Sequence, residues 1–209
     1  MQDKTESSLM LIDFSPLRDD KGNLPDFASR FTVADLKKAT NTYIDTITAL
    51  VDDLSDEQLT FDPEDPHADD PAASNPEDRY IPWNLAHLVL HVTASSEEGA
   101  AFGSMLARGV VIPAGIRLRY EPNWREVTTK EQVLQRLQES RRIRLAYLDT
   151  FPDDPHLDLY RPLDNDSPLN NKINAVGSVL FGLMHEDGHL YQMREVRRQA
   201  LAAINSAGV

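Results

Sequence analysis

The chain has 209 residues, a formal net charge of −13 and no cysteine. This length suits one domain with a substantial core, and the lack of cysteine excludes disulfides, thiolate metal ligands and a cysteine nucleophile. The acidic excess argues against nucleic acid and against anionic membrane surfaces as partners. No apolar run approaches the roughly 20 residues that span a bilayer. The N-terminus lacks the basic start of a signal peptide, so we expect a cytoplasmic protein.

The first 31 residues contain Pro16, Gly22 and Pro25 and show no clear hydrophobic period. We therefore expect an N-terminal arm over residues 1–31 that packs on the domain or is partly disordered. The domain itself is predicted over residues 32–209.

The first long helix is predicted over residues 33–54. Thr32 precedes it as an N-cap, and apolar residues recur at intervals of three and four, which gives one buried stripe. The second helix is predicted over residues 83–108, with Pro82 and Gly109 as its start and stop signals.

The third helix is predicted over residues 130–151, where Pro152 closes it. The fourth covers residues 172–204 and is the longest. Weak strand signals are confined to residues 110–112 and 116–120, which lie in a connection. The pattern therefore predicts an all-α protein, a four-helix bundle.

The predicted helices are separated by connections of roughly 20 residues or more, whereas simple up-down bundles use about 2–8. Such connections are long enough to cross the length of the bundle, so neighbouring helices can run parallel. The acidic segment 62–78 is predicted to be a solvated loop, because it lacks the ligand spacing and central glycine of an EF-hand. His67 and His156, in loops rich in Asp and Pro, are predicted to be solvated.

Two pairs of histidines at i, i+4 spacing carry the main chemical signal. His87 and His91 lie on the second predicted helix, and His185 and His189 on the fourth. Residues four apart project from one helix face, and neutral imidazoles bind a divalent ion at about 2.0–2.1 Å. Two histidines from one helix and one from another form a tripod with an open position, as in catalytic metal sites.

Helical periodicity cannot choose between His87 and His91, which are one turn apart. His91 lies one turn deeper, and a metal ligand needs a rotamer held by surrounding packing. We therefore predict that the ligands are His91, His185 and His189. His87 is left as a residue that supports the site, or as a fourth ligand that would make the site structural.

The run from His185 to His189 also matches H-E-x-x-H, the pattern of zinc metalloproteases, in which Glu186 would be the base. The longer protease pattern is absent, because Gln192 and Glu195 stand where its Gly and His would be. A protease is therefore disfavoured. Glu186 remains either a candidate base or an exposed charge of the helix.

The sequence resembles the DinB/YfiT-like metalloenzyme family. The residues that carry the likeness are WNLAHLVLH, from Trp83 to His91, and H-x-x-x-H-x-x-Q, from His185 to Gln192, with Arg194 or Arg197 beyond. The resemblance covers about residues 32–204.

This resemblance implies a four-helix bundle with long crossover connections, a three-His site for zinc, nickel or a similar ion, and a homodimer. It implies the ligands His91, His185 and His189, with Gln192 orienting a ligand ring or a bound water. Known activities in the family include thiol S-transferases and isomerases that use mycothiol or bacillithiol, and some hydrolases. Gly188 departs from the usual pattern, and we expect it to mark a close backbone approach or a kink.

The leading functional hypothesis is an enzyme whose metal ion activates a water or a thiol for attack on a small electrophile. Because the chain has no cysteine, a low-molecular-weight thiol would have to arrive as a cosubstrate. The alternatives are a stress-related binding or sequestering protein with a structural metal, and a structural dimer without metal.

Overall fold

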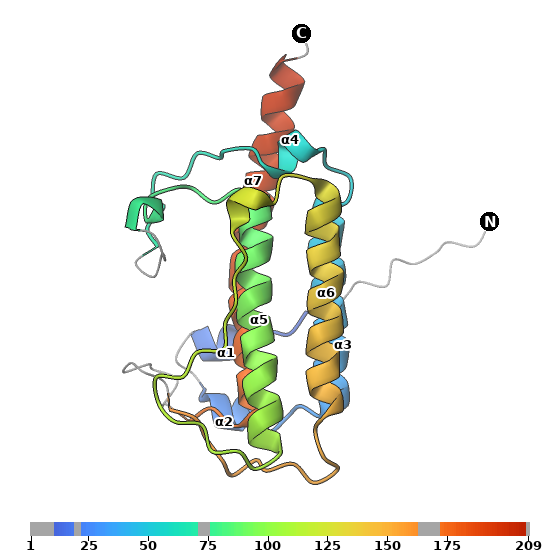
Figure 1. Ribbon diagram of the computed structural model, residues 1–209, viewed down its shortest axis with the longest axis vertical. Coiled ribbons are helices and arrows are strands. Elements are labelled where there is room, and N and C mark those ends of the chain that lie inside the picture. The colour runs from blue at the N-terminus through green and yellow to red at the C-terminus, as the bar shows by residue number, and fades with distance from the viewer. Residues whose placement is uncertain (1–10, 19–21, 71–75, 163–171, 208–209) are drawn as a thin grey trace, which may run out of the picture.

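Figure 1 shows the computed structural model, which describes residues 11–18, 22–70, 76–162 and 172–207. Four long helices stand side by side: α3 (Val33–Val51), α5 (Leu85–Ala107), α6 (Lys130–Asp149) and α7 (Ala175–Ala207). The described residues form no strand, and one isolated bridge pairs Arg161 with Ile173. The predicted all-α bundle is therefore confirmed. None of the described helices combines the length and apolar character that a membrane span requires.

Polar side chains define where the long helices begin. Thr32 accepts a hydrogen bond from the backbone of Asp35, whose carboxylate accepts one in return from the Thr32 backbone, so the two form a capping box. Thr129 and Gln132 form the same arrangement at α6. Asn84 caps α5 by accepting from the backbone N–H of His87. This last cap fixes where the two histidines of α5 lie along the helix.

Helices α3 and α7 run in one direction, and α5 and α6 run in the other (Figure 1). Only the connection from α5 to α6 therefore travels the length of the bundle. It returns along α5, where Arg117 pairs with Glu98 and Trp124 stacks on His87. The other two connections join helix ends at the same end of the bundle, so the expectation of crossover connections holds for this one alone.

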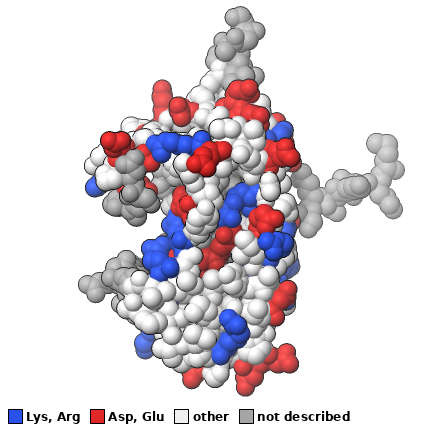
Figure 2. Space-filling view, in the orientation of Figure 1, with Lys and Arg blue, Asp and Glu red and all other residues white. Residues whose placement is uncertain are grey.

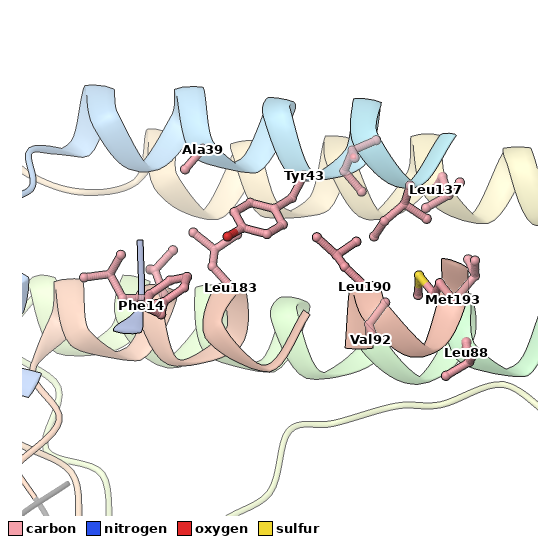
Figure 3. Close-up of a cluster of buried hydrophobic side chains, with 14 of the residues drawn as sticks. Phe14, Ala39, Tyr43, Leu88, Val92, Leu137, Leu183, Leu190 and Met193 are labelled. Atoms are coloured by element: carbon pink, nitrogen blue, oxygen red, sulfur yellow. The ribbon is translucent and has the colours of Figure 1, made fainter. Parts of the chain in front are cut away.

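The core lies between the four long helices. Figure 3 shows Tyr43 of α3, Val92 of α5, Leu137 of α6 and Leu190 of α7 pointing into it, and each of them is buried. Burying a side chain of this size stabilises the fold by about 1.5–3 kcal/mol. The helices that carry the four paired histidines are thus held by apolar packing on their inner faces.

Short helices that were not predicted complete the structure: α1 (Ser15–Arg18), α2 (Leu24–Ala28), α4 (Asp56–Leu59), and the 3-10 turns η1 (Pro76–Asp78) and η2 (Trp124–Glu126). Phe14 and Leu24 are buried in the main core. Residues 11–18 and 22–31 therefore pack on the bundle and contribute to its interior, although the sequence shows no hydrophobic period there.

Candidate metal centre

Small residues bring α5 and α7 unusually close beside the histidines. A Cβ atom added to Gly99 would lie 2.6 Å from the carbonyl oxygen of Ser178, and one added to Gly182 would lie 2.9 Å from the Cα of Ser96. Neither position has room for a larger residue without a shift of the backbone. His185 lies one turn beyond Gly182, so the close approach brings its ring within reach of α5.

Gly188 has no such role. The nearest atom to a Cβ added there is a terminal nitrogen of Arg18 at 4.0 Å, and α7 continues as a helix through this position. The prediction of a close backbone approach at Gly188 is wrong, and the alternative of a local kink stays a prediction. The close approach occurs at Gly182, which the sequence analysis did not single out.

The structure brings His91, His185 and His189 together. One ring nitrogen from each lies within 4.8 Å of those of the other two, and the Nε2 atoms of His91 and His185 are 3.2 Å apart. Two nitrogens bound to one ion at about 2.0–2.1 Å with tetrahedral angles would be about 3.3–3.4 Å apart. The donor set and its spacing therefore fit a divalent metal ion.

Neighbouring polar groups set how two of these rings are turned. The Oε1 of Gln192 lies 2.9 Å from Nδ1 of His189, which leaves Nε2 of that ring for a ligand. The Nδ1 of His91 faces away from His185, toward Arg119 at 2.7 Å and Glu121 at 3.5 Å. Such outer contacts select the tautomer and orientation of metal-binding imidazoles, as predicted for Gln192.

Burial keeps the three imidazoles in the form that binds metal. It lowers the pKa of His91 and His189, and it lowers that of His185 to about 3, with further lowering from the charges of His189 and His91. Neutral imidazole is the metal-binding form, so no proton has to leave these rings near neutral pH. The Nδ1 of His185 is also buried, and it has no hydrogen-bond partner among the described residues.

His87 lies outside the group of three. Its ring stacks on Trp124 with centroids 4.8 Å apart and also contacts Trp83. Its Nε2 lies 3.5 Å from Oε1 of Glu121. His87 therefore supports the carboxylate that faces His91, and no fourth His, Asp or Glu of the described residues joins the group.

Arg119 and Glu121 reach the site from the crossover connection and were not predicted. Arg119 donates to Glu121, and both side chains are partly buried. Burial raises the pKa of Glu121, but hydrogen bonds with His87 and His91 and the charge of Arg119 outweigh it and hold the pKa well below its usual range. The alternating apolar residues of 116–120 indicated only a weak strand. No sequence pattern predicts that this segment lies next to His91.

Glu186 is neither a base at the site nor an exposed charge. It is fully buried and forms an ion pair with Arg144 of α6, whose Nη1 lies 2.8 Å from its Oε2. Ser96 of α5 also donates to this carboxylate. Both interpretations offered by the sequence are therefore wrong, and the carboxylate that the protease pattern requires at the metal is occupied elsewhere.

A cavity of about 200 Å³ opens beside His189. The cavity is lined by His189, Trp83 and Gln192, by Arg79, and by Asp65, His67, Asp69 and Asp70 of the acidic segment. The segment predicted to be a solvated loop thus also forms a wall of the site, and His67 belongs to that wall. Figure 2 shows acidic and basic side chains interleaved over the visible face, without a continuous basic surface.

The chain matches a known protein family over most of its length. A family model described as the DinB superfamily matches residues 40–193, which include all three histidines and Gln192. Comparison with curated proteins and with solved structures gives no match. The family match covers most of the chain, and it agrees with the helical bundle and its histidine cluster. The chain belongs to the DinB superfamily.

Proposed function

We propose that this protein is a metal-dependent enzyme whose ligands are His91, His185 and His189. Zinc and nickel are the ions that the family resemblance favours. The ion would act as a Lewis acid and lower the pKa of a bound water or thiol. The reaction would be attack by that water or thiol on a small electrophile, as in a hydrolase or a thiol S-transferase.

The observation that carries the proposal is the three-sided arrangement of the ligands. Three imidazoles converge, no fourth protein ligand joins them within the described residues, and a cavity opens next to His189. Structural metal sites are closed by four protein ligands, whereas catalytic sites keep one position for water or substrate.

The surrounding residues support a small substrate. Trp83 packs against His91 and His189, with ring centroids 4.4 Å and 5.8 Å apart, and so forms an apolar wall. The aspartates across the cavity, of which Asp69 is paired with Arg79, give it negative charge. Arg79 also lines the cavity, and the ion would add two positive charges beside it, so the aspartates do not exclude an anionic nucleophile. A thiol would come from solution, because the chain has no cysteine.

The test is whether the ion keeps an exchangeable position. Untagged protein is loaded with Co²⁺, and its visible absorption is recorded as 2-mercaptoethanol or azide is added. We expect either ligand to change the spectrum by entering the coordination sphere. A spectrum that neither 2-mercaptoethanol nor azide changes would mean that the coordination sphere is closed. This result would favour the alternative of a binding protein with a structural metal. Substitution His189→Ala is the control that should remove the starting spectrum.

The family resemblance also leads us to propose a homodimer. Light scattering would then give twice the chain mass of 23.5 kDa, and the mass of a single chain over a wide concentration range would contradict it.

A further inference from the structure

Two side chains lie close to the Nδ1 atom of His91. One can bond to Nδ1 only if this nitrogen carries no proton, and the other only if it does. The Nη2 of Arg119 lies 2.7 Å away and can only donate, so this contact requires a lone pair on Nδ1. The Oε2 of Glu121 lies 3.5 Å from Nδ1 and, as a carboxylate, can only accept, so a hydrogen bond between them would require a proton on Nδ1. A neutral imidazole cannot satisfy both at once.

The choice between them decides whether His91 can bind a metal through Nε2. With the proton on Nδ1, the lone pair on Nε2 is free, and this is the atom that lies 3.2 Å from Nε2 of His185. With the proton on Nε2, that lone pair is lost. Glu121 therefore favours the tautomer that binds metal, and Arg119 favours the one that does not.

From this geometry we infer that Glu121 is a positioning residue that selects the metal-binding tautomer of His91. The inference rests on the proposed metal site. Three contacts make Glu121 suitable. Its negative charge is held by Arg119, its Oε1 faces Nε2 of His87, and its Oε2 faces His91. A hydrogen bond from a ligand imidazole to a carboxylate fixes the ring and raises its basicity.

Arg119 does not depend on the hydrogen bond to Nδ1 of His91, because it has other acceptors. The same Nη2 atom donates to the Glu121 carboxylate and lies 3.4 Å from the carbonyl oxygen of His91. Arg119 thus holds the carboxylate in place while competing with it for the ring. Two residues that form one ion pair are therefore expected to affect metal binding differently, and a purely structural ion pair would not produce that result.

The test compares zinc affinities by competition with a chromogenic chelator, using untagged full-length protein. Glu121→Gln keeps the shape but replaces a carboxylate by a weaker acceptor, and we expect it to weaken zinc binding by about 10- to 100-fold. Arg119→Met removes the competing donor and keeps the aliphatic stem, and Glu121 keeps its contact with His87, so the affinity should fall much less than in Glu121→Gln. Arg117→Met is the matched control. It breaks the pair with Glu98 that holds the same connection on α5. Among the described residues Arg117 forms no hydrogen bond or ion pair with a histidine, so the substitution should leave the affinity unchanged.

Two results would overturn the inference while leaving the metal site intact: zinc affinity unchanged in Glu121→Gln, or an equal loss in Glu121→Gln, Arg119→Met and Arg117→Met. A wild-type chain that binds no zinc would instead reject the proposed function, and the inference with it.

A second measurement does not depend on affinity. Proton–nitrogen NMR of ¹⁵N-histidine protein reports the tautomer of His91 directly. In protein stripped of metal, Glu121→Gln should shift His91 toward the form protonated on Nε2, and Arg119→Met toward the form protonated on Nδ1. Zinc-loaded wild type should carry the proton on Nδ1, and a proton on Nε2 in that state would contradict the inference.

Discussion

The helix pair α5 and α7 and the connection from α5 to α6 both reach the same histidines, but by different means. The pair presents His91, His185 and His189 from two packed helices that approach closely at Gly99 and Gly182. The connection presents Arg119 and Glu121 from irregular backbone. An ion pair between Arg117 and Glu98 holds it on α5, and Arg119 and Glu121 pair with each other. The comparison suggests a division of roles, in which the helices position the ligands and stabilise the fold, and the connection adjusts the ligands with little effect on stability.

The largest expected effect concerns the buried ion pair beside the helix pair. Glu186→Gln would leave the buried Arg144 guanidinium without its counter-charge, and losing one partner of such a pair costs about 3–5 kcal/mol. Glu139→Gln is the control, because Glu139 pairs with Arg142 on the exposed face of α6 and should cost at most about 1 kcal/mol. Urea unfolding of both variants measures the difference. Equal and small losses would show that Glu186 contributes little to the bundle.

The second prediction compares two glycines of α7. Gly182→Ala places a methyl group against the backbone of Ser96 and should destabilise the fold by about 1–3 kcal/mol. Gly188→Ala meets nothing closer than a terminal nitrogen of Arg18 at 4.0 Å and should stabilise the helix by up to about 1 kcal/mol. Thermal unfolding distinguishes the two. Stabilisation by both substitutions would contradict the close approach of α5 and α7 at Gly182.

The helices and the paired histidines could be predicted from the sequence, whereas the burial of Glu186 and the role of Gly182 could not. Four helices and the i, i+4 histidine pairs follow from periodicity, because regular helices keep side chains in register over many turns. The burial of Glu186 depends on Arg144, which lies 42 residues away, and the role of Gly182 depends on Ser96. Such long-range contacts leave no local pattern.

The path of the connection from α5 to α6 could not be predicted from the sequence at all. Glu121 is close to His91 only because the connection returns along α5, and irregular backbone has no period from which that path could be read. The same reason explains why α1 and α2 were missed, because each is a single short turn whose apolar residues are recognised only once they meet the core.

The third prediction concerns acid and the metal-stripped protein. Burial lowers the pKa of His185 from its ordinary value of 6.5 to about 3, so in this range the unfolded chain binds a proton that the folded chain does not. Stability should therefore fall as the pH falls from about 6.5 toward 3. Urea unfolding at several pH values measures the slope, and His185→Gln should make it shallower. An identical slope in the variant would mean that burial of His185 does not contribute.

The smallest effect is expected in the connection. Arg117 is largely exposed where it pairs with Glu98, and exposed ion pairs contribute about 0.2–1 kcal/mol. Arg117→Met should therefore change the free energy of unfolding by less than about 1 kcal/mol. If Arg117→Met lowered the free energy of unfolding as much as Gly182→Ala, the connection would also stabilise the fold. This would contradict the proposed division of roles.

The most direct test of the central claim is the metal content of untagged protein, measured by elemental analysis for wild type, His185→Ala and His87→Ala. We expect about one divalent ion per chain in wild type, near zero in His185→Ala, and about one in His87→Ala, because His87 lies outside the group of three. A wild type without metal, or a His185→Ala variant that keeps its ion, would contradict it.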